Sequence, residues 1–119
     1  RDTAQRAAES LLRLPEDRAP SALFASQNLI TIGAIHALHL HDLPPLVGLV
    51  GVDDIELAGM LDPGVTVVAQ DPYAIGRAAA ELLFARIDGS RGPSQHRTIS
   101  TRLVIRGSGE IHPAEGVAA

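Results

Sequence analysis

Residues 46–55 read LVGLVGVDDI, and this stretch decides the fold. Residues 46–52 are apolar apart from two glycines, which is typical of a strand buried on both faces in a parallel sheet. Two aspartates, Asp53 and Asp54, follow directly at its carboxyl end. Because ligands bind outside the carboxyl ends of strands in open α/β sheets, this strand also indicates where a site should lie.

Short apolar strands and helices alternate on both sides of this stretch. Further strands are predicted over residues 22–25, 65–69 and 98–105. Helices are predicted over residues 2–14, 28–40 and 71–89, with a short one over 55–61. The alternation is typical of an α/β fold in which helices flank a mainly parallel sheet. The tail after Gly107 has little pattern, and we expect it to be loosely held.

Two of the helices carry signals at their ends. Asp2 and Gln5 have the spacing of a capping box at the first helix. Asp71 and Pro72 supply an N-cap and a first helical residue to the last helix, and Gly89 ends it. These local signals predict where the two helices start and where the last one stops.

The helix over 28–40 is apolar on all sides rather than along one stripe. One side can face the sheet, so the other side needs a second cover. That cover is either a partner subunit or another part of the same polypeptide, and the pattern alone leaves both open.

Composition excludes several classes of chemistry. The chain of 119 residues has no cysteine, and all ten of its basic residues are arginine. Disulfides, thiolate metal sites, cysteine nucleophiles and lysine-dependent catalysis are therefore excluded. A net charge of −4 argues against this chain binding nucleic acid by itself, and no apolar run reaches the length of a membrane span. The sole methionine is Met60, so we expect a processed chain or a fragment.

Polar side chains follow three of the predicted strands. Gln27 and Asn28 follow residues 22–25, Asp53 and Asp54 follow residues 46–52, and Gln70 and Asp71 follow residues 65–69. Carboxylates accept hydroxyl protons and amides both donate and accept, so this set suits a neutral, hydroxyl-rich ligand. The alternative is helix capping by Asn28, Asp54 and Asp71, because caps favour the same residue types.

Other sites have weaker support. Among His36, His39 and His41, the first two could share a helix face as metal ligands do. Histidine is also favoured near helix ends, and no cysteine or clear third ligand supports zinc. No metal site and no cofactor are predicted. A nucleophile elbow is absent from the sequence, and adjacent aspartates at a strand end point apart. We therefore predict no catalytic residue and no enzyme.

Five segments, in order along the chain, resemble motifs of the LacI/GalR family of transcription regulators. They are ALFASQNLITIGA (22–34), VGVDDI (50–55), DPGVTVVAQ (62–70), GRAAAELL (76–83) and LVIRGS (103–108). The resemblance covers most of residues 22–108. It implies the C-terminal part of a type I periplasmic-binding-protein-like effector domain, which is an incomplete domain.

The resemblance also implies how this part is organised. Residues 1–69 and 98–108 would belong to the C-terminal lobe of the effector domain. The helix over 71–89 would belong to the N-terminal lobe, reached through a hinge near Gln70, and we expect its apolar stripe to lack a normal cover.

Specific contacts are implied by position in these motifs. The residues matching effector contacts of the family are Gln27, Asn28, Asp53 and Gln70. Asn28 stands where the family usually has aspartate, which favours a neutral sugar or polyol over a cationic ligand. The residues matching the dimer face are Ile32, Ile35, Met60 and Leu61.

The function implied is the effector-binding and dimerising part of a cytoplasmic, sugar-responsive repressor. Such a homodimer would bind operator DNA only through a helix-turn-helix that this chain lacks, and it would not contact a membrane. The alternative is a periplasmic sugar-binding component of a transport system, which has the same fold. The segments around Asp53 and Arg106 resemble the regulators more closely.

Overall fold

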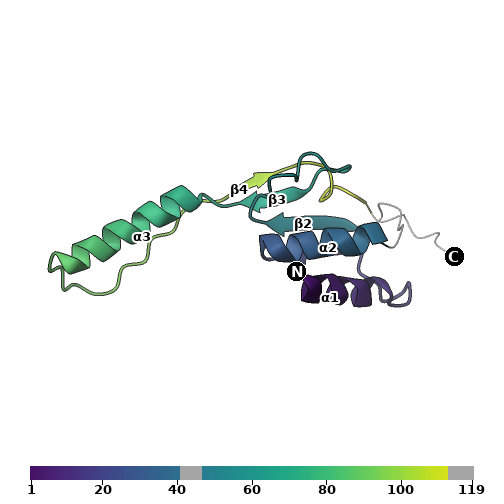
Figure 1. Cartoon of the computed structure of the whole chain (residues 1–119), viewed down its shortest axis with the longest axis horizontal. Helices are drawn as coiled ribbons and strands as arrows, with labels where there is room; N and C mark the ends of the chain where they lie inside the picture. Colours follow the sequence, from purple (N-terminus) through teal and green to yellow (C-terminus); the bar gives the residue numbers. More distant parts are fainter. Residues whose placement is uncertain (41–46, 113–119) are drawn as a thin grey trace. The chain divides into compact units, whose positions relative to one another are not determined.

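The computed structural model describes residues 1–40 and 47–112. Its elements are α1 (Asp2–Leu12), β1 (Ala22–Ala25), α2 (Asn28–Leu40), β2 (Gly48–Val52), β3 (Thr66–Ala69), α3 (Pro72–Ile87) and β4 (Arg102–Val104), shown in Figure 1. His41, Leu46 and the end of the tail, on which some predictions fell, lie outside the described residues. In the described part, no helix combines the length and the apolar character needed to cross a membrane.

The strands form one sheet in the order β1-β2-β3-β4. β1 pairs with β2 and β2 pairs with β3, both in parallel. Ala25 lies opposite Gly51, and Val52 lies opposite Val68, so the carboxyl ends of these strands share one edge of the sheet. The predicted α/β fold with a mainly parallel sheet is confirmed.

The chain divides into two compact units. The first contains residues 1–69 and continues from Leu103, and the second spans Gln70–Arg102. In the first unit α2 lies against β1 and β2, and α1 packs on α2 (Figure 1). The buried core of this unit consists mostly of small side chains: Ala8, Ala25, Ala34, Ala37, Leu49, Ala58, Val65, Val67 and Ala69.

Gly51 permits the close approach of α2 to β2. A Cβ atom at this position would lie 2.6 Å from Oγ1 of Thr31, which is fully buried in α2. Only a residue without a side chain fits there, because real carbon–oxygen contacts are much longer. The glycine in the middle of the strand therefore serves packing between the helix and the sheet.

α1 supplies part of the second cover that α2 requires. Thr31, Gly33, Ala34 and Ala37 are the buried residues of α2, while Leu29, Ile30 and Leu40 are exposed. The intramolecular alternative thus holds for one part of the helix surface. The rest of that surface is accessible in the described chain and includes the apolar side chains of Leu29, Ile30 and Leu40.

The predicted capping box at α1 is wrong. The N-cap residue is Arg1, its side chain makes no capping bond, and Asp2 already lies in the first helical turn. Gln5 instead donates from its side chain to Glu9 over 2.9 Å, one turn along the helix. A carboxylate in the first turn still favours the helix through the macrodipole, so Asp2 stabilises this end without capping it.

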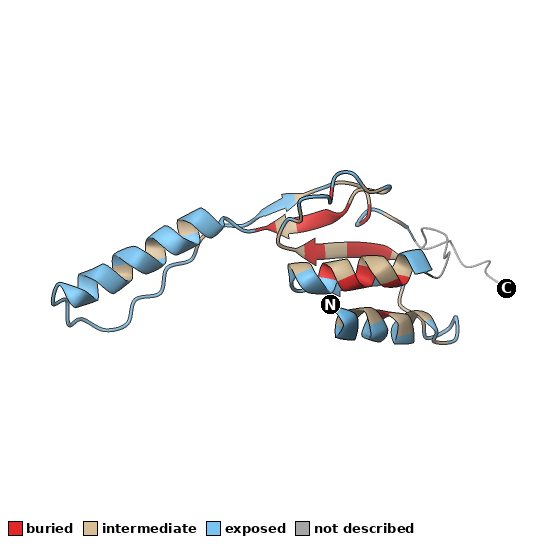
Figure 2. Ribbon diagram, viewed as in Figure 1, coloured by how far each residue is buried: buried red, intermediate tan, exposed pale blue. Residues whose placement is uncertain are grey.

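The second unit contains α3 and the segment after it. Asp71 caps α3 as predicted, accepting a hydrogen bond of 2.9 Å from the backbone N–H of Ala74, and Gly89 adopts a positive φ of 100° after the helix. No residue of α3 is buried (Figure 2). Its exposed apolar side chains include Tyr73, Ile75, Leu83, Phe84 and Ile87. The expected lack of a normal cover is therefore observed for this helix.

Two predicted elements differ in extent or kind. Residues 56–60 form successive turns rather than a helix, closed by bonds from Ala58 N–H to Ile55 O and from Met60 N–H to Leu57 O, both 2.9 Å. So short a segment does not offset the cost of helix nucleation. The last strand covers only Arg102–Val104, because the polar residues before it join no ladder.

The prediction of a loosely held tail after Gly107 is wrong for the residues that follow directly. Ser108 is 4% exposed; its hydroxyl donates to Leu49 O over 2.6 Å and accepts from Thr66 N–H over 2.9 Å. Glu110 accepts bonds from the Thr66 hydroxyl at 3.1 Å and from Gly107 N–H at 2.8 Å. These polar contacts have no hydrophobic pattern, which is why the sequence did not indicate them.

Candidate functional site

Three of the predicted effector contacts meet at one edge of the sheet in the first unit. Gln27 and Asn28 come two and three residues after the end of β1, and Asp53 directly follows β2. Because Ala25 is opposite Gly51 in the parallel register, the residues after each strand emerge side by side. This edge, defined here as the strand-end site, therefore combines two amides and one carboxylate.

Asp53 has an unusual backbone. Its φ is 66°, in the left-handed region that only a few per cent of non-glycine residues adopt, although asparagine and aspartate are enriched there. Its N–H donates to Val68 O over 3.0 Å, so the residue is still attached to β3 when the chain turns. Strained backbone of this kind concentrates at functional sites, where the surrounding structure holds it in place.

Gln27 and Asn28 sit at the start of α2. The carbonyl oxygen of Gln27 accepts from the backbone N–H of Thr31 at 2.9 Å and from its hydroxyl at 3.1 Å, and the Gln27 residue is exposed. Asn28 Oδ1 accepts from the backbone N–H of the neighbouring Leu29 over 2.7 Å. A capping side chain bonds two or three residues ahead, so capping is not the role of Asn28.

Asp54 does not cap a helix either. Its two carboxylate oxygens accept from the two Nη atoms of Arg106, each over 2.7 Å, and Arg106 Nη1 also donates to Val65 O over 3.2 Å. These hydrogen bonds, together with the charge of Asp54, raise the pKa of the Arg106 guanidinium despite some desolvation. The pair was missed from the sequence, although both residues lie within the motifs that carry the family resemblance.

Gln70, the fourth predicted contact, directly follows β3 and is exposed. It is the first residue of the second unit. Its role stays a prediction.

The predicted dimer residues differ in accessibility. Met60 is 82% exposed, at the end of the turns that follow β2. Ile32, Ile35 and Leu61 are half-buried, and the last two pack against the core. Met60 is therefore the most accessible of the four for contact with a partner.

The histidines show no metal-binding arrangement in the described part of the chain. Residues 1–40 and 47–112 contain no group of three or more His, Cys, Asp or Glu placed to hold an ion. His36 Nε2 lies 2.9 Å from an Arg1 nitrogen, and His39 Nδ1 lies 3.0 Å from Ile35 O. His41 lies outside the described residues.

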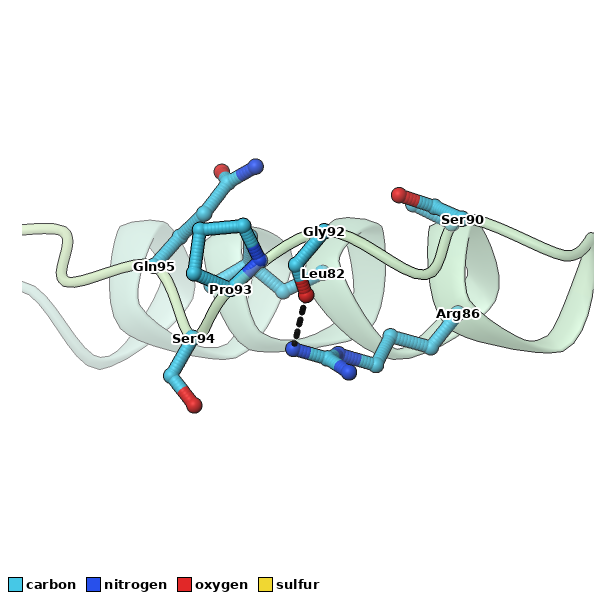
Figure 3. A pocket seen from close by; sticks show the side chains of 8 residues that line it. Leu82, Arg86, Ser90, Gly92, Pro93, Ser94 and Gln95 are labelled. Carbon is cyan, nitrogen blue, oxygen red and sulfur yellow. Dashed lines mark hydrogen bonds between the residues drawn. The ribbon is translucent and has the colours of Figure 1, made fainter.

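A cavity of about 270 Å³ lies within the second unit, between the end of α3 and the segment after it (Figure 3). Its polar lining includes Arg86, Ser90, Ser94 and Gln95, and Arg86 Nη2 donates to Gly92 O over 3.1 Å. None of the predicted effector contacts lines it. The guanidinium is already engaged by the chain itself, so the strand-end site is the better candidate.

Comparison with known proteins identifies relatives that regulate transcription. Residues 1–109 match the family model described as a periplasmic binding protein-like domain. The chain is 32% identical over 114 residues to the HTH-type transcriptional repressor CytR of Escherichia coli K12. The aligned region covers 94% of this chain and 33% of CytR. The chain thus spans about a third of the length of this curated relative.

Solved structures agree with this match. A LacI family transcriptional regulator from Arthrobacter sp. FB24, in complex with lactose, has a TM-score of 0.71 and 31% identity over 92% of this chain and 41% of that one. A complex of the transcriptional regulator CelR with cellobiose has a TM-score of 0.76 and 34% identity, over 91% of this chain and 33% of that one.

Proposed function

This chain belongs to the periplasmic binding protein-like domain family in its LacI-type regulator form, and we propose that it is the effector-binding and dimerising part of a sugar-responsive transcription repressor. The whole protein would be a cytoplasmic regulator rather than a component of sugar transport. The relatives described above are named as regulators of transcription, which favours this function over uptake and over catalysis.

One observation carries the proposal: the carboxylate of Asp53 follows β2 on a left-handed backbone, beside the amides that follow β1. A carboxylate can accept two hydroxyl protons from neighbouring carbons of a sugar, and amides can donate to and accept from the others. We assign effector contact to Gln27, Asn28, Asp53 and Gln70. The two relatives crystallised with lactose and cellobiose support a neutral sugar or a related polyol.

The mechanism is a shift of population between two arrangements of the whole protein. A sugar that binds one arrangement more tightly raises its population by the ratio of the two affinities. The arrangement of two paired subunits then sets the spacing of their DNA-binding heads, which must match two half-sites on the operator. Those heads would be helix-turn-helix domains outside these 119 residues, and no covalent step is involved.

The homodimer is assigned to a surface that includes Ile32, Ile35, Met60 and Leu61. Met60 carries most of this assignment, because it is a large apolar side chain exposed on a tight turn. An exposed methionine is well suited to an interface, since its flexible side chain adapts to a facing surface.

The effector assignment is tested by calorimetry on the full protein that contains this chain, titrated with lactose and with cellobiose. Asp53→Asn keeps the size of the side chain and tolerates the left-handed backbone, but it removes the negative charge. Hydrogen bonds to a charged group contribute about 1.5–3 kcal/mol, so we expect affinity for the bound sugar to fall about 10- to 100-fold.

Arg97→Gln is the control, because it breaks an exposed ion pair with Glu81 in the second unit and should leave sugar affinity unchanged. Binding of none of the sugars, or equal binding by the wild type and Asp53→Asn, contradicts the proposed site.

A further inference from the structure

We propose that Asp54 and Arg106 are a positioning pair, which holds the backbone of Asp53 in the conformation that presents its carboxylate to the ligand. The inference rests on the proposed function, because it assumes that Asp53 contacts the effector. Neither residue of the pair is assigned contact with the ligand itself.

The geometry of the pair is suited to fixing a backbone. Each of the two Nη atoms of Arg106 donates to a different carboxylate oxygen of Asp54, at 2.7 Å. A planar, two-pronged contact of this kind fixes orientation as well as distance. The Asp54 side chain is thus restrained in position and in rotation.

Arg106 is itself anchored at the beginning of β3. Its Nη1 donates to Val65 O over 3.2 Å, and its backbone N–H donates to the Thr66 hydroxyl over 3.0 Å. The residues after it are held by the buried hydroxyl of Ser108. The guanidinium that binds Asp54 is therefore itself fixed to the sheet through these contacts.

Asp53 lies between two attachments. On one side its own N–H is bound to Val68 O at 3.0 Å, and on the other its neighbour Asp54 is bound to Arg106. The left-handed φ of 66° connects the two. Left-handed backbone is disfavoured for L-residues, so an isolated aspartate relaxes to ordinary angles unless its neighbours hold it. Asp54 and Arg106 provide that hold on the carboxyl side.

The pair is better explained by positioning than by stability. The side chains of Arg106 and Asp54 are 23% and 37% exposed, and ion pairs with this degree of access to water contribute little to stability. What the pair does provide is a fixed geometry one residue from the carboxylate that is proposed to bind the sugar.

The test measures hydrogen exchange and sugar binding on the full protein containing this chain. Arg106→Gln removes the ion pair, and Arg97→Gln is the matched control because it removes an ion pair of similar length from the second unit. We expect Arg106→Gln to raise exchange about tenfold or more in residues 52–56, with the rest of the first unit unchanged, and to weaken binding of lactose or cellobiose about tenfold.

Two further variants separate positioning from charge. Arg106→Lys keeps the charge but not the two-pronged contact, so we expect it to resemble Arg106→Gln in exchange and in affinity. Asp54→Asn combined with Arg106→Gln should be no worse than either change alone, because residues that act as a unit are not additive.

The outcomes are distinguishable from failure of the proposed function. The positioning role is overturned if exchange in residues 52–56 does not exceed that of Arg97→Gln, or if it rises equally throughout the first unit. It is also overturned if exchange rises locally while sugar affinity stays the same in a protein that loses binding on Asp53→Asn. If Asp53→Asn itself leaves binding intact, the assignment of Asp53 to the effector fails first and the positioning role fails with it.

Discussion

Replacing Ser108 by alanine should destabilise the first unit strongly, although the sequence predicts a loosely held tail at this position. The hydroxyl satisfies two backbone groups on two different strands: it donates to Leu49 O over 2.6 Å and accepts from Thr66 N–H over 2.9 Å. All three residues are nearly inaccessible to water. Water therefore cannot replace the lost partner without opening the structure.

The magnitude follows from these two contacts. A buried polar group that loses its partner costs about 1–3 kcal/mol, and alanine leaves one donor and one acceptor in that state. The carbonyl of Leu49 has a second lone pair, which lowers its share. We expect Ser108→Ala to reduce the free energy of unfolding by about 2–4 kcal/mol.

The matched control is Ser10→Ala. Ser10 also donates its hydroxyl to a backbone carbonyl, that of Arg6 over 3.0 Å, but it is exposed on α1. Its removal should change stability by no more than about 0.5 kcal/mol. Urea unfolding followed by circular dichroism on the full protein compares the two variants. Equal stability of Ser108→Ala and Ser10→Ala would refute the role assigned to the buried hydroxyl.

Three further changes test other contacts. Gly51→Ala should cost about 1–3 kcal/mol of unfolding free energy, because its methyl group would meet Thr31; wild-type stability in urea contradicts the packing argument. Asp71→Ala should lower the stability of α3 by about 1 kcal/mol and reduce its helical signal in circular dichroism, whereas Asp71→Asn should retain the cap. Equal losses of helical signal in the two variants contradict capping. Met60→Asp should shift the full protein from dimer to monomer in light scattering, and an unchanged mass removes Met60 from the interface.

Features with a local cause could be predicted from the sequence. The apolar runs predicted β1, β2 and β3. For β2 and β3 the reason is that a strand buried in a parallel sheet needs no alternation, whereas two of the four residues of β1 are exposed. Asp71 was recognised as a cap because its hydrogen bond reaches only three residues along the chain. The same apolar runs also predicted where each strand ends. The position of Gln27 and Asp53 at one edge of the sheet could therefore be predicted too.

Features that join distant residues could not. Arg106 and Asp54 are separated by 52 positions, and Ser108 meets Leu49 across 59. Neither contact leaves a period or a spacing in the sequence. The residues after Gly107 have little pattern, so the sequence suggested a loose tail where the structure has the buried hydroxyl of Ser108. The left-handed backbone of Asp53 was also missed, because aspartate adopts ordinary angles at most positions.

The loop between Asp54 and Gly64 carries both kinds of contact that we propose for this chain. It begins beside the carboxylate assigned to the effector and passes through Met60, which is assigned to the dimer. Both of its ends are tied to the segment after β4: Asp54 to Arg106, and Gly64 O to the N–H of Ser108 over 3.0 Å. A ligand that prefers one arrangement of this loop must therefore change the dimer affinity if the interface responds to the same arrangement. Linkage then requires the dimer to change the affinity for the sugar by an equal factor. Weakening the Asp54–Arg106 pair should reduce this factor, both for the effect of the sugar on the dimer and for the effect of the dimer on the sugar. The reason is that one end of the loop would no longer be fixed, so the two sites would no longer respond to the same loop arrangement.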